Sequence, residues 1–370
     1  MEIVTKDDLF YTLVLQKVPN LGDASAKKLI QKAGSPEAVF KEKKSNLLKI
    51  DGIGTLKLKD LGSKDFFALA EEEIQFIEEN KIKTCFFKDE DYPEKLKHCI
   101  DGPILFFQRG NINLNKKRII SVVGTRKVTS YGSAFCEQLI EELAPLDPII
   151  VSGFAYGVDI TAHKAAIKNG LQTIACLAHG LDQIYPKTHK RYVKEVAHHG
   201  GFITEFWSSD DFDRTNFLKR NRIIAGISEA TLVIESAEKG GSLVTAELAN
   251  SYNRDVFAVP GRVNDSQSKG CNNLIKTQRA HLLTSAADLI YILNWQLDET
   301  RPKVIQKQLF VELNNDEKVI FNYLKENSKA HLDTIAYDCK MPIFKATTLL
   351  FDLELKGLVK QLPGKSFELN

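Results

Sequence analysis

The sequence lacks any apolar run that approaches the roughly 20 residues a helix needs to cross a bilayer. The first ten residues, MEIVTKDDLF, also lack the basic stretch and apolar core of a secretory signal. These two absences predict a protein that stays in the cytosol and has no membrane partner.

Cysteines in C-x-x-C spacing are absent as well. The six cysteines are scattered: Cys85, Cys99, Cys136, Cys176, Cys271 and Cys339. In a reducing compartment, scattered thiols behave as small apolar side chains, so we expect no disulfide. The histidines and acidic residues also lack the spacing of a zinc site or of a Ser-His-Asp or Cys-His catalytic set. The sequence therefore predicts no metal, no cofactor and no covalent catalysis.

A large excess of charge of either sign is also missing. The chain has 50 Lys and Arg against 48 Asp and Glu, a net charge of +2. Residues 116–295 have a modest cationic surplus, 21 against 18. A polyanionic partner would therefore bind in a local groove of this middle section, because bulk attraction is too weak.

At 370 residues, the chain is long enough for two or three domains. Residues 1–70 have the pattern of short helices, and the segments VPNLG (18–22) and IDGIG (50–54) each place a glycine turn before a new helix. This is the helix-hairpin-helix (SAM-like) pattern, whose turn amides can bind a DNA phosphate. The simpler interpretation, which we favour, is a small helical domain whose turns need glycine. We expect residues 71–115 to be an extended connecting segment that packs on the next domain.

Residues 116–295 alternate short apolar segments with helical ones. The expected strands are residues 119–123, 149–151, 173–177, 202–204, 231–234 and 256–259. The expected helices are residues 132–143, 158–169, 190–199, 217–226 and 243–252. This alternation predicts an α/β fold with a Rossmann-like, doubly wound and mostly parallel sheet, which binds ligands at the carboxyl ends of its strands.

The C-terminal section begins with a polar linker at 296–315. Residues 316–370 then have three helical stretches and a strand pair that flanks Pro363-Gly364-Lys365, the order of a winged helix. The third helix has an apolar stripe, Ala346, Leu349, Leu350 and Leu353. Its other side has as many acidic as basic residues, which is unfavourable for contact with a phosphate backbone. We therefore favour a protein-interaction or regulatory module over a DNA-reading one.

Four loops at strand ends have the composition of phosphate-binding loops. They contain Gly124-Thr125-Arg126, Ser152-Gly153, residues 178–187 and Gly240-Gly241-Ser242. Glycine lets the backbone approach an anion, and an arginine guanidinium can bind two phosphate oxygens at once. Many α/β turns need glycine for other reasons, and the loops alone do not distinguish a mononucleotide from DNA.

The segment Phe217–Gly226 favours a polynucleotide. Its start contains three cations in four residues, Lys219, Arg220 and Arg222, where the helix dipole disfavours positive charge unless an anion lies nearby. Phe217, Tyr156 and Phe154 are candidates for stacking on bases, which is how single strands are bound without sequence preference. Core packing is the equally weighted alternative for Phe217.

Six strings resemble the DprA/Smf family in order and spacing: SVVGTRKVTSYG, VSGFAYGVDITAHKAA, HGLDQIYP, NFLKRNRIIAGIS, KGGSLVTAELA and RDVFAVPG. The upstream strings YPEKL and GPILFFQRG fit as well. The resemblance implies a protein that binds single-stranded DNA, forms a homodimer through the Rossmann-like domain and loads the RecA recombinase during DNA uptake and transformation. The expected DNA-binding residues are Gly124, Thr125, Arg126, Ser152, Gly153, Phe217, Arg220, Asn221, Arg222, Gly240, Gly241 and Ser242.

The chain departs from the family pattern at two places. His189 stands where an asparagine is expected, and Thr277-Gln278-Arg279-Ala280 replaces an expected Gly-Ala turn. The second departure lies near a possible dimer surface, which we expect within residues 274–290 from the apolar residues Leu274, Ile275, Leu282 and Leu283.

The strongest alternative is an enzyme. Residues 240–247, GGSLVTAE, are similar to the Gly-Gly-x-Gly-Thr-x-x-Glu loop of Rossmann-like nucleoside-monophosphate phosphoribohydrolases, with Glu247 and Arg126 as candidate catalytic residues. Leu243 replaces the phosphate-contacting glycine of that loop, which argues against this alternative. A dinucleotide-dependent dehydrogenase is less favoured, because the first loop is Gly-Thr-Arg and not G-x-G-x-x-G.

Overall fold

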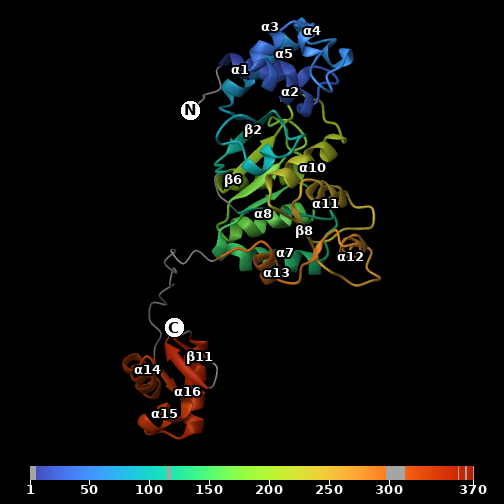
Figure 1. Ribbon diagram of the computed structural model, residues 1–370. Coiled ribbons are helices and arrows are strands. Elements are labelled where there is room, and N and C mark those ends of the chain that lie inside the picture. Colours follow the sequence, from blue (N-terminus) through green and yellow to red (C-terminus); the bar gives the residue numbers. More distant parts are fainter. Residues whose placement is uncertain (1–5, 115–117, 297–312, 357, 363–364, 370) are drawn as a thin grey trace. The chain divides into compact units, whose positions relative to one another are not determined.

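The computed structural model describes residues 6–114, 118–296, 313–356, 358–362 and 365–369. The chain divides into two compact units, residues 1–298 and 299–370, which we describe separately (Figure 1). The expected linker at 296–315 lies mostly outside the described residues.

A mixed sheet forms the centre of the first unit. Its nine strands among the described residues follow the order β1-β2-β6-β5-β4-β3-β7-β8-β9. The seven strands from β6 to β9 in this order pair in parallel, whereas β2 pairs antiparallel with both β1 and β6. The strand order reverses at β3, because β4 lies on one side of it and β7 on the other. This doubly wound arrangement confirms the predicted fold class.

The strands of the parallel core lie within two residues of the expected segments. They are β3 (Ile119–Val123), β4 (Ile149–Ser152), β5 (Thr173–Cys176), β6 (Gly200–Thr204), β7 (Ala230–Val233) and β8 (Asp255–Ala258), with a short edge strand β9 (His281–Leu282). Residues of β3, β4, β5 and β6 are all buried, as expected for strands covered on both faces.

Helices cover both faces of this sheet. They are α7 (Ser130–Leu143), α8 (Val158–Lys168), α9 (Val193–His198), α10 (Asn216–Ile227), α11 (Gly241–Ser251), α12 (Lys269–Lys276) and α13 (Ala286–Ile292), with η3 (Lys187–Tyr192) before α9. One hydrophobic cluster joins strand residues to α10, α11 and α12, and another joins them to α7, α8 and α13. The expected helix at 190–199 is instead a 3-10 turn followed by the short α9.

Residues 71–115 are more than a connecting segment. They contain β1 (Lys83–Phe86), α6 (Glu94–Lys97) and β2 (Leu105–Gly110), and the two strands extend the central sheet. The first four residues of β2 are buried, so this apolar run enters the sheet instead of lying on its surface.

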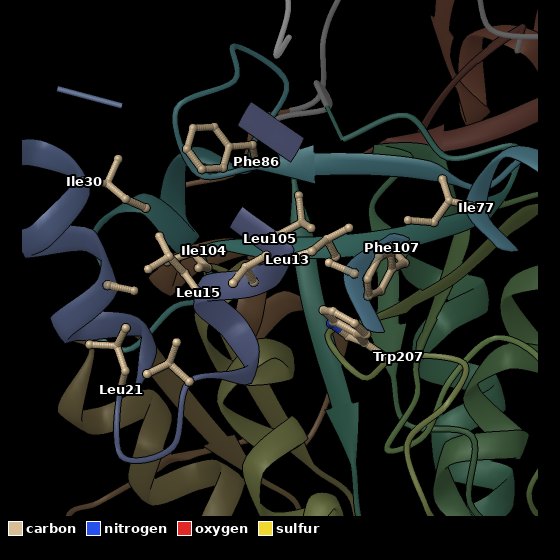
Figure 2. Close-up of a cluster of buried hydrophobic side chains, with 14 of the residues drawn as sticks. Leu13, Leu15, Leu21, Ile30, Ile77, Phe86, Ile104, Leu105, Phe107 and Trp207 are labelled. Carbon is tan, nitrogen blue, oxygen red and sulfur yellow. The ribbon is translucent and has the colours of Figure 1, made fainter. Parts of the chain in front are cut away.

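The N-terminal helices pack against β1 and β2. They are α1 (Lys6–Lys17), α2 (Asp23–Ala33), α3 (Pro36–Lys41), α4 (Lys44–Leu47), η1 (Thr55–Leu58) and α5 (Lys64–Glu79), which runs past the expected boundary at residue 70. Figure 2 shows Leu13 and Leu15 of α1 beside Leu105 and Phe107 of β2, with Trp207 below them. This continuous core explains why the helices and the sheet form one unit.

The lysines near the second glycine turn make internal contacts. Lys57 Nζ donates to the Gly52 carbonyl and to Ser25 Oγ, both at 2.8 Å, and Lys28 Nζ donates to the Asp51 carbonyl at 3.1 Å. Gly52 has a φ of 79°, a left-handed conformation that favours glycine. These contacts support the simpler interpretation of a helical domain with glycine turns.

The second unit is the predicted winged helix. It contains α14 (Asn315–Asn327), β10 (Lys329–His331), α15 (Leu332–Asp338), α16 (Ile343–Leu355), β11 (Val359–Leu362) and β12 (Ser366–Leu369), with the sheet order β10-β12-β11. Ala346, Leu349, Leu350 and Leu353 of α16 are buried in its core, as the apolar stripe predicts. Pro363 and Gly364 lie outside the described residues.

Candidate functional site

A pocket of about 660 Å³ lies where the strand order reverses, at the carboxyl ends of β3 and β7. This is the place where doubly wound sheets bind their ligands. We call it the switch-point pocket. It is lined by Val123, Gly124, Thr125, Arg126, Ala155, Asp159, Tyr185, Phe212, Arg214, Phe217, Leu218, Arg220, Asn221, Ile224, Ala237, Gly240, Gly241, Ser242 and Thr245.

The start of α11 forms one side of the switch-point pocket. Gly240 is its N-cap residue, and Gly241 and Ser242 are its first two residues, so the positive end of the helix dipole lies at the pocket. Ser242 Oγ donates to Ser236 Oγ at 2.9 Å, which holds this turn in place. The arrangement is suited to a phosphate group, because amides and a helix start face one space.

Two arginines from different elements lie in the switch-point pocket at different depths. Arg126 is exposed in the β3–α7 loop, and its guanidinium lies 5.3 Å from the centre of the Phe217 ring. Arg220 is 5% exposed and donates a hydrogen bond to the Cys176 carbonyl. Burial lowers the pKa of Arg220, and the nearby Asp159 carboxylate opposes that shift. The exposed side chain of Arg126 can therefore change its conformation when a ligand binds. The buried side chain of Arg220 is a fixed positive charge in the floor of the pocket.

Asp159 places a carboxylate in the same floor. Burial raises its pKa, and the Arg220 charge and a hydrogen bond from the Ala155 amide (3.3 Å) oppose the shift. Because Asp159 offsets the charge of Arg220, the net attraction for an anion comes mainly from Arg126, the exposed Arg214 and the start of α11.

Three aromatic rings form a cluster on the wall of the switch-point pocket. The Tyr185 ring lies 4.9 Å from Phe212 and 5.6 Å from Phe217, and Phe212 lies 5.8 Å from Phe217, centre to centre. Tyr185 and Phe212 are about 40% exposed. Aromatic faces beside cationic side chains provide a stacking surface for bases. Tyr185, Phe212 and Arg214 were missed by the sequence prediction.

Besides Tyr156, which is described below, four expected residues do not line the switch-point pocket. Arg222 lies on another face of α10, where it donates to Asp23 Oδ2 (3.0 Å), to Glu205 and to the Asp101 carbonyl. The remaining three follow one another after β4 begins: Ser152, Gly153 and Phe154. The Ser152 hydroxyl donates to the Val122 carbonyl at 2.6 Å. Gly153 packs beneath the pocket, and Phe154 is buried. Ser152 has no free hydroxyl proton for a ligand, and Phe154 has no exposed face for stacking.

A basic strip continues from the rim of the switch-point pocket. η3 follows Tyr185, and its residues Lys187, Lys190 and Arg191 are exposed. Tyr156, 44% exposed, lies against this strip and shares a 2.9 Å hydrogen bond with the Thr188 hydroxyl. The strip places further cations and an exposed ring beside the pocket.

The two departures from the family pattern have structural explanations. His189 is buried and donates from Nδ1 to the Phe154 carbonyl at 3.0 Å, so it supports the loop of β4. Gln278 adopts a φ of 58° after α12, which is the left-handed turn that glycine would favour. Leu274 and Leu283 of the expected dimer surface are buried, which leaves Leu282 as the exposed leucine there.

The structure does not bring together the two candidate catalytic residues of the enzyme alternative. Glu247 is exposed and pairs with Arg279 at 3.5 Å, and it is not among the residues that line the switch-point pocket. Arg126 lines the pocket, so the two residues proposed for catalysis are not brought together.

The fold and the pocket define a Rossmann-like α/β protein whose switch point carries a pocket lined by arginines, aromatic rings and a helix start. The chain belongs to the DNA recombination-mediator protein A family, DprA/Smf: the family model matches residues 83–294, and the DprA winged helix model matches residues 309–365. In the part of the chain that the structure describes, no helix combines the length and apolarity needed to span a membrane.

Relatives support this assignment. Protein Smf of Synechocystis sp. is 30% identical over 97% of this chain and 98% of its own length. DNA processing protein DprA of Streptococcus pneumoniae is 38% identical over 57% of this chain and 74% of its own length. Its solved structure has a TM-score of 0.66 and 30% identity, and the match covers 78% of this chain and 98% of that one.

A second solved structure, of DNA processing protein A from Helicobacter pylori, has a TM-score of 0.53 and 28% identity. The match covers 58% of this chain and 98% of that chain. That structure is described as giving the single-stranded DNA binding mode of the Helicobacter protein.

Proposed function

We propose that this chain binds single-stranded DNA in the switch-point pocket without covalent chemistry. The observation that carries the proposal is that one pocket combines two kinds of group. Its cations and helix start are suited to phosphates, and its aromatic cluster is suited to bases. Single strands are bound in this way because their bases are free to stack. The DNA-binding residues are those expected residues that line the pocket, with Tyr185, Phe212 and Arg214 added and the basic strip of η3 extending the track.

The test is a titration with single-stranded and double-stranded oligonucleotides of one sequence, followed by fluorescence anisotropy. We expect tighter binding of the single strand, because a duplex hides the base faces from the aromatic cluster. Equal affinity for both forms contradicts the proposal. Incubation with nucleoside monophosphates gives a separate control, and base release that Glu247→Gln abolishes would establish the hydrolase instead.

We further propose that the chain loads the RecA recombinase onto the bound strand during transformation, in the cytosol, as the family assignment suggests. This step needs no catalytic residue, because the protein only has to present the strand to its partner. Strand-exchange assays with RecA and DNA coated with single-strand-binding protein test it. Addition of this chain should shorten the lag phase, and an unchanged lag contradicts the proposal.

The chain is also proposed to form a homodimer through the edge of its sheet at β9. Two features support a contact there: β9 is the edge strand of the sheet, and Leu282 is 50% exposed. Tyr291 of α13, the next helix along the chain, is 86% exposed. Light scattering at micromolar concentration should give the mass of a dimer, and Leu282→Lys should give a monomer. A monomeric wild-type protein contradicts this proposal.

A further inference from the structure

A second pocket, of about 600 Å³, lies next to the switch-point pocket and has no role in the function proposed above. We call it the flanking pocket. It is formed by the start of α7 and by the loop between β8 and α12. Its lining residues are Thr129, Ser130, Tyr131, Pro260, Gly261, Arg262, Asp265 and Ser268.

The two pockets share their loops. The β3–α7 loop contributes Arg126 to the switch-point pocket and Thr129 to the flanking one, and three residues of extended chain span at most about 11 Å. The β8–α12 segment is fixed to the β7–α11 loop, because the Gly270 amide donates to the Ser236 carbonyl at 2.8 Å. A single flexible strand is long enough to occupy both pockets at once.

The chemistry of the flanking pocket matches that of a strand-binding site. Tyr131 is 54% exposed, and its hydroxyl donates to the Pro260 carbonyl at 3.4 Å, which orients the ring. Arg262 is exposed, and no hydrogen bond or ion pair of its guanidinium occurs among the described residues. Lys127, which lies in the sequence between Arg126 and Thr129, is exposed as well.

The one carboxylate in the flanking pocket is bound locally. Asp265 accepts hydrogen bonds from the Gln267 amide at 2.9 Å and from the Ser268 hydroxyl at 3.3 Å. These contacts occupy the carboxylate in the turn that precedes α12. Asp265 is half-buried and keeps its charge, whereas Tyr131 and Arg262 are exposed, and an aromatic ring beside a cation is the combination that binds a nucleotide by stacking and by charge.

We propose that the flanking pocket binds the next nucleotides of the same DNA strand, with Tyr131 stacking on a base and Arg262 bound to a phosphate. The proposal rests on the function proposed for the switch-point pocket and extends its binding track toward α12. Short oligonucleotides occupy the switch-point pocket alone, and longer ones reach both pockets.

The experiment compares oligothymidylates of 4 and 12 nucleotides on the full chain, by fluorescence anisotropy at low salt. The double variant Tyr131→Ala, Arg262→Ala should bind the 12-mer about tenfold more weakly than the wild type, since one stacked base and one phosphate contact are lost. Its affinity for the 4-mer should change less than twofold. Tyr131→Phe should bind the 12-mer like the wild type, because the ring remains.

Matched controls are Tyr337→Ala, an exposed tyrosine of the second unit, and Lys276→Ala, an exposed cation at the end of α12 outside both pockets. Neither should change binding of either oligonucleotide. Wild-type affinity of the double variant for the 12-mer, or an equal loss for both lengths, overturns the flanking-pocket proposal and leaves the function of the switch-point pocket standing. Failure of the wild-type protein to bind either length overturns both.

Discussion

Arg220 and Asp159, from two different helices, both press against the backbone of Gly153. A Cβ atom on Gly153 would lie within 2.5 Å of Arg220 Nη1 and closer still to Asp159 Oδ2. Both side chains are buried and held by hydrogen bonds, Arg220 to the Cys176 carbonyl and Asp159 from the Ala155 amide, so a methyl group at Gly153 would have to displace them. The floor of the switch-point pocket therefore depends on a glycine directly after β4. Gly153 contributes to the site by making room for these two side chains, and it does not contact a ligand itself.

Gly153→Ala should displace Arg220 and Asp159 from the pocket floor. We expect the unfolding free energy of the first unit to fall by about 1–3 kcal/mol, because a methyl group is forced into a filled space. Affinity for single-stranded DNA should fall as well. Denaturant unfolding and anisotropy titrations measure the two effects, and wild-type values in both would show that the floor is not packed as described.

Arg222→Ala should reduce stability without changing the salt dependence of DNA binding. Arg222 bridges Asp23 of α2 and Glu205 after β6, and its removal leaves two partly buried carboxylates without their counterion. We expect a loss of about 3 kcal/mol for the first unit, measured by denaturant unfolding. A shallower salt slope with unchanged stability would instead place Arg222 on the DNA.

Because of His163, the free energy of unfolding should be lower in mild acid than at neutral pH. Its Nε2 donates to the Gly153 carbonyl at 2.5 Å, its Nδ1 shares a 2.6 Å hydrogen bond with Thr173, and burial lowers its pKa to about 4. Below its ordinary pKa of about 6.5, the unfolded chain takes up a proton that the folded state excludes, so stability falls as the pH drops from 6.5 toward 4.

Between pH 7 and pH 5, the contribution of His163 to this loss is about 2 kcal/mol. The variant His163→Gln removes the titrating group, so its unfolding free energy should depend less on pH by that amount. Unfolding curves at the two pH values measure the difference. An equal pH dependence in the wild type and the variant would contradict the buried, neutral state of His163.

Part of this site could be predicted from the sequence. Glycine turns at the ends of strands and the buried strands themselves are local signals, and they correctly located Arg126, Arg220 and Gly240–Ser242 at one edge of the sheet. The prediction that the Arg222 side chain faces the pocket was wrong, although the geometry of an α-helix is enough to predict its direction. Residues two apart on an α-helix point about 200° apart, so Arg220 and Arg222 do not face the same pocket.

Other parts could not be predicted because they depend on tertiary contacts. Tyr185 and Phe212 are 27 residues apart in the chain, and only the fold brings their rings to 4.9 Å. The strands β1 and β2 were missed for a similar reason, since an apolar run before the first parallel strand is equally typical of a packed extended segment. Their antiparallel pairing with β6 is a long-range contact.

The winged helix should not contribute to the DNA affinity of the first unit. On α16, Phe344 is 76% exposed and Phe351 is 58% exposed, and Lys345 and Lys356 are paired with Asp316 and Glu317. An apolar helix with paired cations is unsuited to a phosphate backbone. The double variant Phe344→Ser, Phe351→Ser should therefore bind single-stranded DNA with wild-type affinity in an anisotropy titration. A large loss of affinity would assign a DNA contact to α16.

The most direct test of the switch-point pocket is the salt dependence of single-strand binding by the wild type, Arg126→Ala and the control Lys276→Ala. Each phosphate contact contributes about 0.7 to the slope of log affinity against log salt for a single strand. We expect Arg126→Ala to weaken binding and to make the slope shallower by about one contact, with Lys276→Ala unchanged. Unchanged affinity and slope in Arg126→Ala, or a wild-type protein that binds mononucleotides and ignores oligonucleotides, would contradict the account.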